Sequence, residues 1–271
     1  MKSLNQQYRE LVANILENGT EATTRGLNYK YVFGAELTFD ASKGTFPLID
    51  SHKVYWKVAL GEILWDLHGE GKLENIPYKG LRDVWSNFAV DGVVPNSYYY
   101  NWRKAFGRDQ IVDLIDGLSN NPTSRSHILQ SYNPAAANGM PQCHPMVIYS
   151  SDGEYLDCLV VGRSNDVAGY GTSIDLIRYW FLLTYFAQNA NLIPRIMKFT
   201  ISNAHIYESS YIDAAFISQA PLLPECTAHY FFDADGKVQG NLRTAYNKPY
   251  IQAAYKLTSN VEIGDTDCYG I

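Results

Sequence analysis

The residues of this chain best suited to chemistry are a cysteine and a histidine that stand side by side, Cys143 and His144, with a proline close on either side. A thiol attacks carbon only as the thiolate, and a free cysteine has a pKa of about 8.5, so a nearby cation has to lower that pKa. Arg125 and Arg163 are the candidate cations in the sequence. On the Cys-His pair alone, a buried and inert cysteine is the alternative interpretation.

Other polar residues follow the pair in an ordered series. Residues 163–167 read Arg-Ser-Asn-Asp-Val, and His205 and Tyr207 come after the next predicted helix and strand. Upstream, Glu62 precedes an Ile-Leu-Trp run on a predicted helix. A carboxyl group desolvated by such neighbours holds its proton more tightly, which suits proton relay. The alternative is a glutamate on the exposed face of that helix.

Hydrophobic periodicity predicts the elements that must position these side chains. Apolar residues at helical spacing predict helices over residues 4–18, 53–68, 109–118 and 174–191, the last of them apolar most of the way round. Alternation predicts strands over residues 29–39, 126–131, 145–150, 155–161 and 196–202, while residues 20–28 are mostly polar and are predicted to form a loop. The mixture, without an internal repeat or linker, predicts a single α+β domain over residues 1–271.

The composition argues against several classes of protein. The 271 residues are 46% apolar and 18% charged, enough for a large core, and a net charge of −6 argues against a protein that coats nucleic acid. No apolar run approaches the ~20 residues of a membrane helix, and the N-terminus lacks the apolar segment of a signal peptide. The four cysteines show no CxxC or metal-ligand spacing. We therefore expect a cytoplasmic protein without a metal site, which requires neither a membrane nor nucleic acid.

Taken in order, these segments resemble the thymidylate synthase superfamily, including the phage deoxycytidylate (dCMP) hydroxymethylases. The resemblance extends from about residue 8 to about residue 218, and it rests on Gly-Glu-Ile-Leu-Trp at 61–65, Val-Trp-Ser-Asn-Phe-Ala at 84–89, Tyr-Tyr-Tyr-Asn-Trp-Arg at 98–103 and the three segments already described. It implies a thymidylate synthase-like fold, in which a large twisted mixed β-sheet carries helices on one face and a homodimer interface on the other. It also implies one-carbon transfer to C5 of a pyrimidine nucleotide, with 5,10-methylenetetrahydrofolate as co-substrate.

The resemblance assigns roles to individual residues. Cys143 is expected to attack C6 of the pyrimidine, with Glu62 and Asp175 as the other catalytic residues. The residues expected to hold the 5′-phosphate are Arg25, Arg163 and Ser164, together with Arg125 from the second subunit of a homodimer. The remaining assignments are His205 and Tyr207 for the sugar, Asp175 and Tyr98 for the base, and Trp85, Asp166, His52 and Ile271 for the folate.

One position is expected to distinguish the base. Aligned through Tyr179, this position is Asp175 here, whereas uracil-using synthases have asparagine and cytosine-using hydroxymethylases have aspartate. A carboxylate accepts from the 4-amino group of cytosine and, when protonated, donates to N3, but it opposes the O4 acceptor of uracil. The alternative is that Asp175 only caps the helix that follows. We expect cytosine, so the predicted substrate is dCMP.

The sequence departs from the usual synthase pattern around this site. Gly162 replaces a glutamine, Phe88 replaces a tryptophan, and the arginine that normally follows Arg125 is lost, a loss for which His127 is the candidate substitute. The replacements at Gly162 and Phe88 indicate a site altered from that of the usual synthase, and the segment at 163–167 resembles that of the phage hydroxymethylases. We therefore expect hydroxymethylation, in which water completes the product with help from Glu62. The alternatives are C5 methylation of dUMP or dCMP, hydroxymethylation of dUMP, and an inactive relative that binds a nucleotide or RNA.

Overall fold

The computed structural model describes residues 2–41, 45–136, 141–223, 226–232, 238–243 and 261–262. Its helices are α1 (Leu4–Asn18), α2 (Trp56–His68), α3 (Lys79–Ser86), α4 (Tyr98–Arg103), α5 (Gln110–Asn120), α6 (Tyr170–Asn189) and α7 (Tyr211–Gln219), with the 3-10 turns η1 (Leu73–Asn75) and η2 (Glu208–Ser210). Its strands are β1 (Thr20–Thr24), β2 (Leu27–Asp40), β3 (Thr45–Phe46), β4 (Ile128–Gln130), β5 (Met146–Ser151), β6 (Tyr155–Gly162), β7 (Asn165–Asp166), β8 (Ile193–Tyr207), β9 (Cys226–Phe232), β10 (Val238–Arg243) and β11 (Val261–Glu262).

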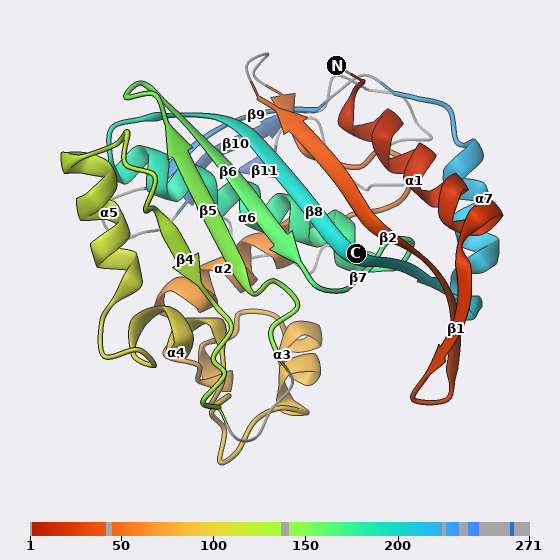
Figure 1. Cartoon of the computed structure of the whole chain (residues 1–271), viewed down its shortest axis with the longest axis horizontal. Helices are drawn as coiled ribbons and strands as arrows, with labels where there is room; N and C mark the ends of the chain where they lie inside the picture. The colour runs from red at the N-terminus through yellow and green to blue at the C-terminus, as the bar shows by residue number, and fades with distance from the viewer. Residues whose placement is uncertain are drawn as a thin grey trace.

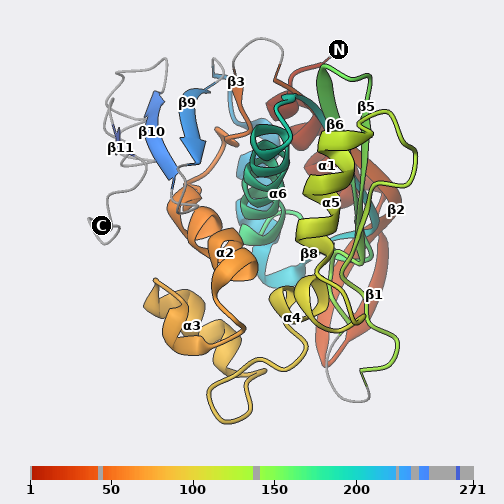
Figure 2. The ribbon, with the colours of Figure 1, turned by 90° about the vertical axis from the view of Figure 1, so that its left-hand side faces the viewer.

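Most of the strands form one mixed sheet, in the order β1-β2-β8-β6-β5-β4, with β7 paired to β8. The pairs β6–β8 and β7–β8 are parallel, and the other neighbours are antiparallel. In Figure 1 this sheet faces the viewer, and Figure 2 shows α2, α5 and α6 together on its other side. The expected α+β class, with a large mixed sheet and helices on one face, is confirmed.

A second, smaller sheet has the order β11-β10-β9-β3. It lies on the far side of α6 from the main sheet (Figure 2). Strand β3 connects it to the core, because the ring of Phe46 packs 5.7 Å from the ring of Phe181 on α6. Helix α6 is therefore enclosed between layers, which explains why its sequence is apolar on nearly every side.

The period of two along the strands separates a buried face from an uncovered face. On β5 and β6 the alternate residues Val147, Tyr149, Leu156, Cys158 and Val160 are buried against the helices. The residues between them point to the opposite face, where Ile128, Ile148 and Leu159 lie in register across β4, β5 and β6. Ile128 is 47% exposed, so this row leaves apolar surface on the uncovered side of the sheet.

One predicted loop proves to be a hairpin. Residues 20–24 form β1 and pair with β2 through a two-residue turn, Arg25-Gly26, in which both residues have positive φ (49° and 75°). Two such residues form the turn whose twist matches that of antiparallel strands. The prediction of a loop was wrong because β1 is exposed along most of its length and therefore lacks the apolar alternation by which a strand is recognised.

Among the described residues, no helix has both the length and the apolar character needed to span a bilayer.

Candidate active site

The candidate nucleophile lies on the irregular segment that leads into β5. The backbone carbonyl of Cys143 accepts from the backbone N–H of Arg163 at 2.8 Å, which joins this segment to the end of β6. The Arg163 side chain then turns back: its Nε donates to the carbonyl of Gln142 at 3.0 Å, and its Nη2 lies 3.7 Å from the Cys143 sulfur. Burial raises the pKa of the Cys143 thiol, and the charge of Arg163 opposes that rise. Arg163 is thus placed to stabilise the thiolate when it forms.

His144 is buried at the centre of a polar network. Its Nδ1 lies 3.3 Å from the hydroxyl of Tyr98, which also accepts from the His144 backbone N–H at 3.3 Å. Its Nε2 lies 3.3 Å from the amide nitrogen of Asn165 and 3.4 Å from Oδ2 of Asp175. The imidazole therefore connects α4, β7 and α6 directly behind the nucleophile.

Asp175 lies within α6 and not at its start. The helix begins at Tyr170 with Gly169 as its N-cap residue, so the interpretation of Asp175 as a simple helix cap is wrong. Its Oδ2 accepts from the amide of Asn165 at 2.8 Å. Burial acts to raise the pKa of Asp175, but His144, Arg178 and Asn165 outweigh that effect, so the pKa of this carboxyl is below its usual value. The side chain is therefore an ionised hydrogen-bond acceptor near neutral pH.

A buried arginine that is not among the predicted site residues lies beside this carboxylate. Arg178 donates to Asp66 on α2 through Nε at 3.0 Å and also through Nη2. Its Nη1 lies 3.6 Å from Asp175 and 4.0 Å from Glu62, and its guanidinium lies 4.5 Å from the centre of the Tyr98 ring. Two signals were available in the sequence: a lone arginine on an apolar helix, three residues after Asp175, and an aspartate four residues after Glu62.

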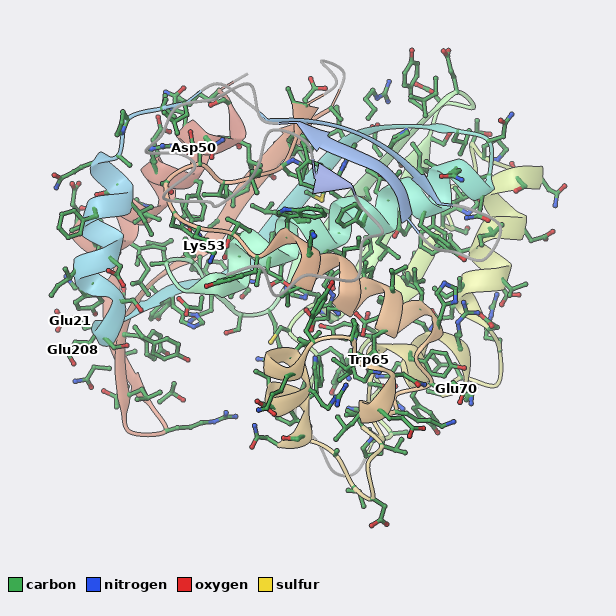
Figure 3. The ribbon with its side chains drawn as sticks, turned by 180° about the vertical axis from the view of Figure 1, so that it is seen from behind. Glu21, Asp50, Lys53, Trp65, Glu70 and Glu208 are labelled. Atoms are coloured by element: carbon green, nitrogen blue, oxygen red, sulfur yellow. The ribbon has the colours of Figure 1, made fainter. Side chains whose placement is uncertain are left out.

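Glu62 is buried and is held by an aromatic residue of a neighbouring helix. The indole N–H of Trp85 on α3 donates to Oε1 of Glu62 at 3.0 Å. The Trp85 ring also lies 5.2 Å from the ring of Trp65, which Figure 3 shows on α2 near α3. The interpretation of Glu62 as a residue on the exposed helix face is therefore wrong, because only 8% of the residue is exposed.

These groups open into one cavity of about 670 Å³. This volume is within the range of small-molecule sites, about 300–1,000 Å³. Apolar side chains between residues 84 and 95, among them Phe88, form one part of its wall. The predicted site residues that line the cavity are Glu62, Trp85, Tyr98, Cys143 and Asp175.

The residues predicted to hold the sugar cluster on β8 and its neighbours. His205 is paired in register with Asp166 of β7, and its ring lies 5.0 Å from the ring of Tyr207. Burial and the charge of Asp166 raise the pKa of Tyr207, while Arg25 opposes them. Arg25, at the tip of the β1–β2 hairpin (Figure 1), is therefore close enough for its charge to act on Tyr207. Ser164 is half-buried between Arg163 and β7.

Asp166 turns its carboxylate toward the start of α6. Its Oδ1 accepts from the backbone N–H of Gly169 at 3.1 Å, and burial raises its pKa. A side chain on Gly169 would collide with this carboxylate, because an added Cβ would lie 2.0 Å from Oδ2. The glycine at the N-cap position is thus explained by the position of Asp166.

Other predicted site residues lie outside the cavity wall that the described residues form. Arg125 is exposed in the turn before β4. His127, the candidate substitute for the lost arginine, is buried, and its Nε2 lies 2.9 Å from the carbonyl oxygen of Asn121, so it does not face solvent. His52 lies 3.1 Å from the hydroxyl of Ser173, and burial lowers its pKa to about 4. Ile271 is outside the described residues.

Within the part of the chain that the structure describes, no group of three or more His, Cys, Asp or Glu side chains is arranged to hold a metal ion. The described cysteines, Cys143 and Cys158, are both free thiols.

A protein-family model described as thymidylate synthase matches residues 6–227. The match includes every residue of the cavity wall described above. The chain belongs to the thymidylate synthase family. More specifically, it is a folate-dependent pyrimidine nucleotide C5 transferase, since this family transfers one carbon from methylenetetrahydrofolate.

Proposed function

We propose that the protein is a dCMP hydroxymethylase, which uses 5,10-methylenetetrahydrofolate and water. One observation carries the choice of base: the carboxylate of Asp175 and the thiol of Cys143 line the same cavity. Asn165 engages Oδ2 of Asp175, so Oδ1 is the oxygen that can accept from the 4-amino group of cytosine. The same oxygen would face the O4 acceptor of uracil, which disfavours dUMP.

In the proposed reaction, the thiolate of Cys143 bonds to C6 and breaks the C5=C6 π-bond, so that an electron pair becomes available at C5. The folate supplies a carbon at the oxidation level of formaldehyde. C5 bonds to that carbon and loses its proton. Both bonds from that carbon to the folate nitrogens break, the hydroxyl of water adds to the same carbon, and departure of the thiolate restores the ring double bond. The C5 proton and one water proton leave with tetrahydrofolate, so the nucleotide gains CH2O.

The residues around the nucleophile support this chemistry. Arg163 is held beside the sulfur, where it favours the charged thiolate at the start and the departing thiolate at the end. Glu62 is fixed by Trp85 at the cavity wall, where its carboxylate can activate the water that completes the product. Phe88 also lines the cavity, at the position where the family's second tryptophan is expected.

The nucleotide contacts follow the same scheme. Arg25, Arg163 and Ser164 would bind the 5′-phosphate, and the paired side chains of His205 and Tyr207 would bind the sugar. Tyr98 would contact the base, since its hydroxyl is fixed against His144 at the cavity wall. The apolar wall that contains Trp85 fits the flat rings of the folate, with Asp166 and His52 as further folate-binding residues.

We also propose that a second copy of the chain covers the uncovered sheet face and contributes Arg125. The apolar row of Ile128, Ile148 and Leu159 supports this assembly, because an exposed apolar surface on a sheet favours association. Arg125 is exposed three residues before β4, which carries one end of that row. A two-fold dimer would therefore place the same arginine near each partner's site.

Two further proposals concern the whole chain. We take residues 1–271 as one catalytic domain. We also place it in the cytoplasm, because the proposed nucleophile works only while its thiol stays reduced, and that compartment is reducing.

The test is incubation of the purified protein with methylenetetrahydrofolate and either dCMP or dUMP, followed by mass analysis of the nucleotide. A gain of CH2O on dCMP is expected, without the rise in near-ultraviolet absorbance that accompanies dihydrofolate. A gain of CH2 with that rise would identify a methylase, and modification of dUMP alone would overturn the proposed reading by Asp175. Failure of Cys143→Ala to abolish either product would exclude the covalent route.

A further inference from the structure

Arg178 is oriented in a way that divides its guanidinium between two tasks. The edge formed by Nε and Nη2 binds a single oxygen of Asp66, which is fully buried on α2. The remaining nitrogen, Nη1, faces the cavity, 3.6 Å from Asp175 and 4.0 Å from Glu62. One nitrogen thus approaches both of the carboxylates that the proposed function requires.

Burying this ion pair costs free energy of desolvation. Removing a guanidinium and a carboxylate from water costs free energy that their mutual attraction often fails to offset. The ring of Tyr98 offers a second contact by stacking on the guanidinium, yet the cation remains 3% exposed and the aspartate 0% exposed. Moreover, Oδ1 of Asp66 has no hydrogen-bond partner among the described residues. The pairing therefore gives Arg178 two hydrogen bonds, while one of the two carboxylate oxygens of Asp66 accepts none from the described residues.

We propose that Arg178, fixed in direction by Asp66, is a positioning residue that holds the carboxylates of Glu62 and Asp175 in place beside Cys143. The inference deepens the proposed function, and its part concerning base selection rests on that function. Without this cation, two buried carboxylates and a thiolate would gather in one cavity, offset by Arg163 and, when it is protonated, by His144. Like charges at that density disfavour one another's ionisation.

The groups that face Asp175 come from every element packed around it. They are Arg178 and Tyr179 on its own helix, Asn165 on β7, Cys143 and His144 on the segment before β5, Glu62 and Asp66 on α2, and Tyr98 on α4. Of these, Arg178 is the permanent cation, because His144 carries a charge only when protonated. Loss of Arg178 should therefore raise the pH needed to keep Asp175 ionised.

The experiment compares wild type with Arg178→Met, Arg178→Lys, Asp66→Asn and a matched control, Arg195→Met. Arg195 also pairs with two aspartates, Asp152 and Asp157, but it does so at the surface, away from the cavity. For Arg178→Met, we expect kcat for dCMP to fall roughly 10- to 100-fold and the acid limb of kcat/KM to move about one pH unit upward. Arg178→Lys should restore part of the rate and return the acid limb toward wild type. For Asp66→Asn, kcat and the pH of the acid limb should lie between those of the two Arg178 variants.

A second measurement does not depend on any substrate. The rate at which iodoacetamide alkylates Cys143, followed by peptide mass analysis across pH, reports the charge around the thiol. Because Arg178 lowers the pKa of that thiol, Arg178→Met should shift the alkylation profile to higher pH, while Arg195→Met should leave it unchanged. Unchanged alkylation and rate profiles in a folded Arg178→Met variant would overturn the proposal. If wild type turns over neither nucleotide, the proposed function fails, and the alkylation profile still decides the role of Arg178.

Discussion

The indole N–H of Trp85 reaches from α3 to the buried carboxylate of Glu62 on α2, 3.0 Å away. Trp85→Phe preserves an aromatic ring against Trp65 but removes that donor. Since a hydrogen bond to a charged group contributes about 1.5–3 kcal/mol, we expect kcat to fall about 10-fold or more, with little change in KM for the nucleotide. Steady-state kinetics on a variant with native circular dichroism would test this.

The matched control is Trp180→Phe, which removes an indole from the core beside Phe39 and should leave kcat near wild type. An equal fall of kcat in both variants would contradict the role of the hydrogen bond.

Replacement of Asp175 by asparagine should change the preferred base. An amide can donate to O4 of uracil and accept from its N3–H, whereas the carboxylate opposes O4. We expect Asp175→Asn to lose dCMP turnover by roughly 100-fold and to gain dUMP turnover, because an unpaired buried polar group is strongly disfavoured. The measurement is kcat/KM for both nucleotides, with Glu62→Gln as a control that should reduce turnover without reversing the preference. A variant that still prefers dCMP would show that the base is read elsewhere.

His52 should make the fold less stable in acid. Burial lowers the pKa of its imidazole to about 4, against an ordinary value near 6.5. Between these values the unfolded chain binds a proton that the folded chain does not, so stability falls as pH falls from about 6.5 toward 4. The difference corresponds to at most about 3 kcal/mol.

His52→Gln removes this linkage while keeping a polar partner for Ser173. Urea unfolding at pH 8 and at pH 5 should therefore show a smaller loss of stability on acidification in the variant than in wild type. Identical losses in the two proteins would mean that His52 does not titrate as its burial indicates.

The shared site can be tested by mixing two inactive variants. Cys143→Ala lacks the nucleophile and Arg125→Ala lacks the phosphate contact proposed to come from the partner. In a mixed two-fold dimer, one site carries both defects and the other carries neither, so random mixing should restore up to about a quarter of wild-type activity.

The control mixes Cys143→Ala with Arg163→Ala, whose two side chains meet within one subunit. In that mixture each site of a hybrid dimer keeps one defect, and no recovery is expected. Absence of recovery in the Arg125 mixture as well, despite exchange of subunits, would place Arg125 in its own subunit's site or outside the site altogether.

The strands and helices with strong periodicity were predictable, and so were the residues that belong to local motifs. Cys143 and Arg163 were recognised because short stretches on either side of them carry the signal, and the structure brings them within 3.7 Å. Strand β1 was missed because its residues are exposed and polar, so that only the Arg25-Gly26 turn distinguishes it from a loop. The turn depends on positive φ at both residues, and an arginine in a sequence does not indicate positive φ.

The rest of the site depends on contacts between distant parts of the chain. Arg178 and Asp66 are 112 residues apart, and neither belongs to a motif, so their ion pair could not be predicted from local spacing. The sequence left two roles for Asp175, and the position of Gly169 at the start of α6 excluded one of them. The suggestion that His127 replaces the lost arginine did not account for the direction of its side chain. The imidazole turns inward against Gly117, and the order of residues in the sequence does not determine that direction.

The segment that carries Cys143 and the helix that carries Asp175 are separate elements that meet at the cavity. Codons for aspartate and asparagine differ at one nucleotide. Under the proposed reading of the base by Asp175, a single point mutation in the gene would redirect the enzyme from one nucleotide to the other while the attacking thiol and its arginine stay as they are.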